Sequence, residues 1–145
     1  MLEKIDISDI CVNIQANDWE DAIQKSSKIL LEKGIIGPEY VDAMINVVKD
    51  NGPYIVITKH IALAHAQSRF GVNSEGITFA TLKPPVPFNV QDMDPVKLII
   101  TLAATDPDAH VDLLGEIAEV LMDEDKVEQL FEADTNEQFL EVLKG

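Results

Sequence analysis

The 145-residue chain has few of the residues that staple small secreted proteins or bind polyanions. Its single cysteine, Cys11, excludes an internal disulfide and a cysteine-rich zinc site. Only 11 lysines and arginines stand against 26 aspartates and glutamates, and the net charge of −15 argues against nucleic acid or an anionic membrane as a partner. The sequence also lacks an apolar run of about 18 residues and the features of a signal peptide. We therefore expect a cytoplasmic protein that is not embedded in a membrane.

What remains is the composition of a globular domain. Hydrophobic residues make up 46% of the chain, and its length allows a sizeable core, so we predict a single domain over residues 1–145. Thirteen of the 26 carboxylates fall in residues 106–145, which contain only two cations, Lys126 and Lys144. This acidic region is either a solvated helical face or a surface that steers a basic partner.

Hydrophobic periodicity and helix breakers predict the element order β-α-α-β-β-β-α-α. Strands are expected at 7–14, 54–58, 76–82 and 96–104, and helices between Asp18 and Gly34, at 38–48, from Asp106-Pro107 to 121, and in closing segments at 127–131 and 139–143. Three prolines make 83–88 an extended loop. This order favours an α/β fold in which a mixed central β-sheet is flanked by helices on both faces.

The stretch from Gly52 to Ala66 contains the residue that we single out as reactive, His65. The apolar run 54–58 follows the breaker Asn51-Gly52-Pro53 and is typical of a buried strand, and a second short run, 61–63, comes just before the histidine. A histidine that directly follows a rigid strand is held in place by the scaffold, which is what a reactive group needs.

A second histidine, His110, follows the apolar run 96–104. Open α/β sheets gather their ligand sites along the carboxyl ends of the strands, so we expect His65 and His110 to meet at one edge. In the first turn of the helix after Asp106-Pro107, His110 would lie where a helix favours anions. A neutral imidazole has a lone pair for attack and forms covalent intermediates. A phosphoryl group is an anion that suits such a site.

A phosphoryl group also needs cations that balance its charge. The only arginine, Arg69, comes four residues after His65, which is one turn if the segment is helical, and Lys49 also lies in the middle of the sequence. Structural alternatives stay open. His110 also fits a hydrogen-bonded core histidine, Arg69 a solvated loop cation, and His60 a surface residue at a strand end. His60, His65 and His110 could instead form a three-histidine metal site.

These motifs resemble the enzyme IIA domains of the bacterial phosphoenolpyruvate-dependent sugar phosphotransferase system, in the mannitol/fructose class and closest to its ascorbate-type branch. In that family an apolar approach of the form Gly-x-Ala-x-Pro-His ends in the phosphorylated histidine, and here the approach is His60-Ile-Ala-Leu-Ala-His65. Further matches are Gly52-Pro-Tyr-Ile-Val-Ile57, Gly71-Val72, Leu82-Lys-Pro-Pro-Val-Pro-Phe-Asn89, Asp94-Pro-Val-Lys-Leu-Ile-Ile-Thr-Leu-Ala-Ala104, and His110 followed by Leu113-Leu114. The similarity runs over essentially the whole chain.

The resemblance implies a phosphocarrier that works without a cofactor or metal. It would accept a phosphoryl group from phospho-HPr on His65 and pass it to a cysteine of a IIB protein, for uptake of a sugar such as ascorbate or a pentitol. His110 would stabilise the phosphoryl group, and Arg69, Lys49 and His60 are candidate phosphate-binding residues. HPr and the IIB component would be the partners; a homodimer is left open.

Three positions depart from the family pattern. Ala64 stands where the family has proline, His60 where it has glycine, and Lys49 where the mannitol-type proteins have arginine. Proline would fix the backbone before the histidine and glycine would permit a bare turn, while lysine supplies charge without a planar fork. These departures motivate a second hypothesis, a diverged regulatory or interaction module on the same fold with little phosphotransfer.

Overall fold

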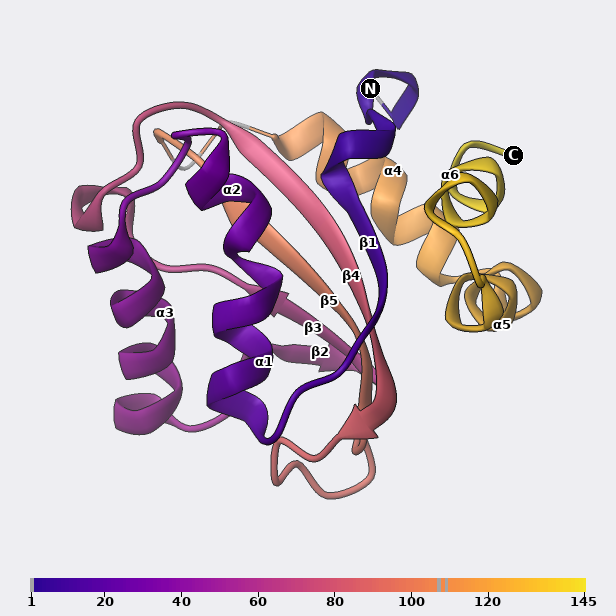
Figure 1. Cartoon of the computed structure of the whole chain (residues 1–145), viewed down its shortest axis with the longest axis horizontal. Helices are drawn as coiled ribbons and strands as arrows, with labels where there is room; N and C mark the ends of the chain where they lie inside the picture. Colours follow the sequence, from indigo (N-terminus) through magenta and orange to yellow (C-terminus); the bar gives the residue numbers. More distant parts are fainter. Residues whose placement is uncertain (1, 107, 109) are drawn as a thin grey trace.

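The computed structural model describes residues 2–106, 108 and 110–145 and contains a mixed five-stranded β-sheet (Figure 1). The strand order is β1-β4-β5-β3-β2, with β1 at Ile10–Ile14, β2 at Val56–Thr58, β3 at Ile61–Ala64, β4 at Gly76–Val86 and β5 at Val96–Ala103. β1 is parallel to β4 and β3 to β5, whereas β4–β5 and β2–β3 are antiparallel pairs. The predicted α/β class is confirmed.

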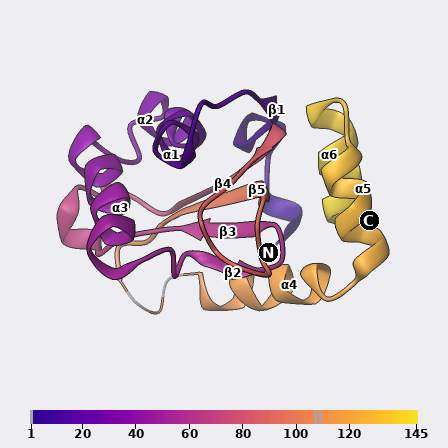
Figure 2. The same cartoon turned by 90° about the horizontal axis from the view of Figure 1, so that it is seen from below.

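Helices cover both faces of the sheet (Figure 2). The first face carries α1 (Trp19–Ser26), α2 (Lys28–Glu32) and α3 (Pro38–Asn51), and the second carries α4 (Val111–Leu121), α5 (Glu124–Glu132) and α6 (Asn136–Lys144). Central strand β5 serves both cores because successive side chains of a strand point to opposite faces. Ile99 packs with the first group of helices, while Leu98 and Ile100 pack with the second.

Local capping explains where several helices begin. The side chains of Asp18, Asp123 and Thr135 each accept a hydrogen bond from the backbone N–H three residues later, and Pro38 occupies the first turn of α3. Asp6 caps a short 3-10 turn, Ile7–Asp9, by accepting from the backbone N–H of Ser8, two residues later. The first strand therefore begins at Ile10 and not at residue 7.

The predicted buried strand at 54–58 is only partly correct. β2 is limited to Val56–Thr58 at the edge of the sheet, and the side chains of Tyr54 and Ile57 are 79% and 46% exposed. The second apolar run forms β3, which pairs with β5 in the sheet interior. β3 is therefore the rigid strand that precedes His65.

The predicted loop at 83–88 is wrong for residues 83–86, because β4 continues to Val86. The register between β4 and β5 shifts between Thr81 and Val86. This irregular stretch contains Pro84 and Pro85, which have no N–H to donate to a regular ladder. The strand therefore passes through the prolines where its pairing is interrupted.

Candidate functional site

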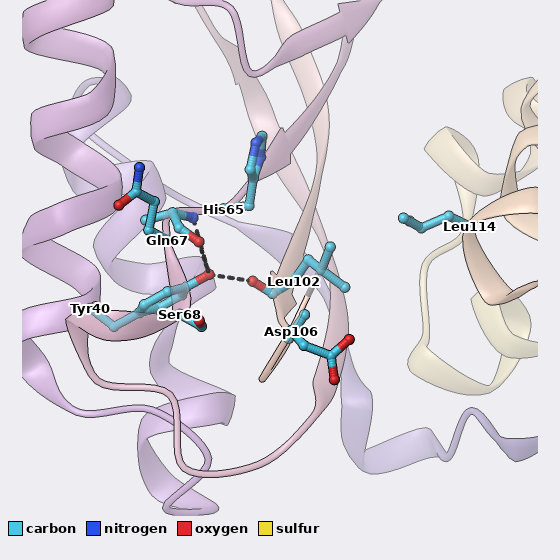
Figure 3. A pocket seen from close by; sticks show the side chains of 9 residues that line it. Tyr40, His65, Gln67, Ser68, Leu102, Asp106 and Leu114 are labelled. Carbon is cyan, nitrogen blue, oxygen red and sulfur yellow. Dashed lines mark hydrogen bonds between the residues drawn. The ribbon is translucent and has the colours of Figure 1, made fainter. Parts of the chain in front are cut away.

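His65 is the first residue after β3, at the carboxyl end of that strand. The parallel pairing of Ala64 with Thr101 places it beside the last residues of β5. Figure 3 shows His65 beside the strand end that carries Leu102, with its ring turned away from Tyr40 and Asp106 and with Leu114 of α4 on the other side of the pocket. Two strand ends that are far apart in sequence therefore share one edge, as expected for an open α/β sheet.

The imidazole of His65 is held by the backbone of its own strand. Nδ1 lies 2.8 Å from the carbonyl oxygen of Leu63. A carbonyl oxygen can only accept, so Nδ1 donates its proton and the lone pair of the neutral ring resides on Nε2. Because His65 is exposed, Nε2 is the nitrogen that an incoming group would meet.

His110 is tied in the same manner to the end of β5. Its Nε2 lies 3.2 Å from the carbonyl oxygen of Ala103, so Nε2 donates and Nδ1 is directed elsewhere. The helix begins later than predicted, at Val111, and His110 is its N-cap residue with a left-handed φ of 72°. The predicted first-turn position of His110 is therefore wrong, and Pro107, the predicted helix start, lies outside the described residues.

A pocket of about 320 Å³ lies next to His65. It is lined by Tyr40, His65, Ala66, Gln67, Ser68, Leu102, Ala104, Asp106 and Leu114. The described lining contains no lysine or arginine, and it includes the carboxylate of Asp106. Ala104 directly follows the residue that binds His110, so both histidines belong to this edge of the sheet.

Tyr40 is a residue of this pocket that sequence reasoning missed. It is fully buried on α3, and its hydroxyl donates to the carbonyl oxygen of Leu102 at 2.7 Å and accepts from the N–H of Ala66 at 3.1 Å. Burial raises the pKa of this phenol above its ordinary value of 10.0, because the buried phenolate would lose its hydration. The sequence feature that could have identified Tyr40 is its spacing of four residues from Met44, which places both residues on the buried face of α3.

A carboxylate near His110 was also missed. Glu75 precedes β4, and the hydroxyl of Thr105 donates to its Oε1. This hydrogen bond holds the pKa of Glu75 below its ordinary value, with a smaller contribution from the charge of His110. Glu75 is exposed, so water screens the interaction.

The structure does not bring His60 to this pocket. His60 precedes β3, so the length of that strand, roughly 13 Å, separates it from His65. Its Nδ1 lies 2.7 Å from the carbonyl oxygen of Pro95, and its ring meets the ring of Phe131 edge-on. The three histidines therefore do not converge, and no group of metal-binding side chains occurs among the described residues.

The two candidate cations lie outside the pocket as well. Lys49 is more than two turns along α3 from Tyr40 and pairs with Glu20 of α1 at 3.3 Å. Arg69 stacks on Phe70, with its guanidinium carbon 4.6 Å from the ring centroid. The chain at 65–67 is not helical, so Arg69 is not one helical turn from His65 and instead lines a neighbouring pocket.

Comparison with known proteins adds the family. The family model described as "Phosphoenolpyruvate-dependent sugar phosphotransferase system, EIIA 2" matches residues 3–145. The ascorbate-specific phosphotransferase system EIIA component of Shigella boydii serotype 4 is 30% identical over 135 residues, which is 92% of this chain and 88% of the relative. The mannitol-specific cryptic phosphotransferase enzyme IIA component of Escherichia coli is 33% identical, over 94% of this chain and 92% of the relative.

Solved structures agree with this result. The complex of mannitol enzyme IIA with phosphorylated mannitol enzyme IIB from Escherichia coli contains a similar chain, with a TM-score of 0.84 and 26% identity over 98% of both chains. The chain belongs to the enzyme IIA family of the phosphoenolpyruvate-dependent sugar phosphotransferase system, in its mannitol/fructose-like, ascorbate-type branch. Members of this family transfer phosphoryl groups for sugar uptake. In the part of the chain that the structure describes, no helix has the length and apolarity needed to cross a membrane.

Proposed function

We propose that the chain is a phosphocarrier that takes up a phosphoryl group on Nε2 of His65 and passes it on. The observation that carries this proposal is the hydrogen bond from Nδ1 of the exposed residue His65 to the Leu63 carbonyl, which leaves the lone pair on Nε2. That lone pair forms the new N–P bond while the P–N bond of the donor breaks and its electron pair returns to the donor nitrogen.

Phosphorylation turns the His65 ring into an imidazolium, because Nδ1 keeps its proton. The carbonyl oxygen of Leu63 accepts from this N–H and stabilises the positive charge. Because Nδ1 keeps its proton, the ring leaves as a neutral imidazole when the N–P bond breaks and the electron pair returns to Nε2, so the same hydrogen bond assists the second transfer. Little further chemistry is asked of the protein, and positioning and electrostatics supply the catalysis.

His110 is the proposed partner of the phosphoryl group. Its Nε2–H is taken by Ala103, so it would donate from Nδ1, and it does so as an imidazolium. A positive donor is needed because the described pocket lining has no lysine or arginine and includes Asp106. Its left-handed backbone also fits a constrained functional residue. Arg69, beside the pocket, stays a candidate for contacts with the phosphoryl group.

The proposed donor is phospho-HPr, and the proposed acceptor is a cysteine of a IIB protein. A complex between a similar enzyme IIA and phosphorylated IIB supports the second partner. Phe70 and Val111, which are 38% and 57% exposed, supply apolar surface in the segments that follow His65 and His110. Relatives specific for ascorbate and mannitol support ascorbate or an alditol as the sugar. HPr-dependent transfer would take place in the cytoplasm.

The family departures do not favour the alternative regulatory role. Ala64 is buried in β3, where it pairs with Thr101 of β5. The strand pairing therefore fixes the backbone before His65, as the family proline would do. His60 lies at the far end of the strand and leaves the pocket open. The match over residues 3–145 also supports one domain.

Phosphoryl transfer from phosphoenolpyruvate through enzyme I and HPr tests the proposal. We expect one phosphoryl group per wild-type chain, mapped to His65 by mass spectrometry, and none on the His65→Ala variant. His60→Ala is the matched control, because it removes the imidazole at the other end of β3, and it should be labelled like the wild type. Labelling of His65→Ala at the wild-type level would contradict the proposal.

A further inference from the structure

We infer that Tyr40 is a positioning residue that fastens the two histidine-bearing strand ends together for phosphoryl transfer. The inference rests on the proposed function. Tyr40 is on α3, which provides no histidine, and its side chain has no exposed surface. Its role therefore has to be exerted through the groups that its hydroxyl contacts.

The backbone groups that the hydroxyl contacts belong to residues next to His65 and next to Ala103, which binds the ring of His110. Ala66, whose N–H donates to the Tyr40 oxygen at 3.1 Å, is the residue after His65. Leu102, whose carbonyl accepts from the hydroxyl at 2.7 Å, precedes Ala103, the residue that binds the His110 ring. A single oxygen atom therefore joins the end of β3 to the end of β5, as the dashed lines in Figure 3 show.

The chemistry of the hydroxyl makes this connection specific. It has one proton, and the shorter distance assigns that proton to Leu102, since the contact with the Ala66 carbonyl is 3.3 Å. Donation requires the neutral phenol, which burial favours. The ladder between β3 and β5 extends only to Ala64 and Thr101, so the Tyr40 oxygen continues the link beyond the last paired residues.

Removal of the oxygen would leave two partly buried backbone groups without this partner. The N–H of Ala66 and the carbonyl of Leu102 could then be satisfied only if water entered or the segments moved. Either change alters the distance between the phosphoryl acceptor and its proposed stabiliser. A displacement of about 1 Å in a reacting group costs up to roughly a hundredfold in rate.

Tyr40→Phe is the variant that removes only this oxygen. Thr81→Val is the matched control, because Thr81 is a buried residue of β4 whose hydroxyl accepts from the N–H of Asn13 at 2.7 Å, outside the pocket. Single-turnover transfer from phospho-HPr is measured over a range of HPr concentrations. If Tyr40→Phe is not fully folded, all three proteins are compared in an osmolyte that favours the folded state.

We expect Tyr40→Phe to lower the transfer rate at saturating phospho-HPr about ten- to a hundredfold. The half-saturating concentration should stay within about twofold, because the exposed docking residues are unchanged. Thr81→Val should change neither quantity. Hydrogen exchange of the Ala66 amide gives a second readout that is independent of activity, and its protection should fall about tenfold or more in Tyr40→Phe alone.

The outcomes separate this inference from the proposed function. If the wild type takes no label, or takes it at a residue other than His65, the proposed function fails whatever Tyr40→Phe does. If the wild type is labelled at His65 and Tyr40→Phe transfers as fast as Thr81→Val, the positioning role alone is overturned. An equal loss of rate in both variants would also overturn it, because the loss would then follow from stability.

Discussion

A histidine flanks each end of strand β3, and only His65 lies at the pocket where we propose phosphoryl transfer. At the carboxyl end, Nδ1 of His65 donates to the carbonyl of Leu63 at 2.8 Å. At the amino end, Nδ1 of His60 lies 2.7 Å from the carbonyl of Pro95. The hydrogen-bond distance of Nδ1 is thus nearly the same at both ends, and the tautomer alone does not make a histidine reactive.

What differs is the space around Nε2. The cavity at His60 is lined by Lys59 and by the carboxylates of Glu124, Asp125 and Glu128, and its excess of negative charge would repel a phosphoryl group. It also includes Phe131, whose ring meets that of His60 edge-on. The pocket at His65 includes Asp106 as its only described carboxylate and lies at the edge of the sheet where His110 is attached. We therefore expect the residues at the neighbouring strand end to decide which of the two histidines reacts.

The largest expected difference between the two ends is the position of the phosphoryl group. We expect it on Nε2 of His65 and on no nitrogen of His60, because the Leu63 carbonyl keeps Nδ1 of His65 protonated. Nitrogen-15 NMR of the phosphorylated protein, with coupling to phosphorus-31, identifies the bonded nitrogen. Coupling to Nδ1 of His65 would show that the hydrogen bond to Leu63 does not direct the reaction.

The next largest effect should come from His110. His110→Asn removes the imidazole but suits the left-handed φ of 72°, which asparagine tolerates better than alanine. We expect transfer from phospho-HPr to slow by about a hundredfold, the size of effect seen when one preorganised donor is lost. The matched variant His60→Asn, also at a left-handed φ of 70°, should change the rate less than twofold, as measured by rapid quench.

An equal rate of transfer from phospho-HPr in His110→Asn and His60→Asn would contradict the proposed difference in function between the two histidines. It would mean that the imidazole at β5 does not contact the phosphoryl group. The wild-type rate for His110→Asn would have the same meaning, and the charge would then have to be balanced by Arg69 or by backbone N–H groups.

A smaller effect, on stability, should appear at the amino end instead. His60→Asn loses the edge-on contact with Phe131 and changes the bond to Pro95. We expect the free energy of unfolding to fall by about 1–2 kcal/mol, from the loss of one aromatic contact and the weakening of one partly buried hydrogen bond. Urea unfolding at pH 7 measures this change. A loss below about 0.5 kcal/mol would indicate that the His60 ring contributes little to packing.

The convergence of the two strand ends could be predicted from the sequence, because parallel strands gather their carboxyl ends at one edge. The prediction that His60 contributes to the same site was wrong because that reasoning did not consider the length of the strand between His60 and His65. A short strand separates residues at its two ends by its whole length, although they are close in sequence. Lys49 was misplaced for a similar reason, since closeness in sequence does not show which neighbour a helical side chain will pair with.

Tyr40 and Glu75 illustrate what sequence periodicity leaves out. An apolar stripe predicts which face of α3 is buried, but it does not show where a buried hydroxyl finds its partners. Those partners, Ala66 and Leu102, are backbone groups, and backbone groups leave no residue signature. Glu75 meets Thr105 only because β4 and β5 pair with Gly76 opposite Ala103, a register that the sequence does not state.

The smallest effect is expected from the charge of Glu75 at the His110 end. Its pKa is lowered in the folded protein, chiefly by the hydrogen bond from Thr105, so the carboxylate adds stability above its unfolded pKa, about 4.3, which is lost as the pH falls through the folded value. Glu75→Gln keeps an acceptor for Thr105 and removes only the charge. We expect the urea midpoint of the wild type to exceed that of the variant slightly at pH 7 and the gap to close near pH 2. A gap of the same size at both pH values would exclude the charge as its cause, because the amide does not titrate.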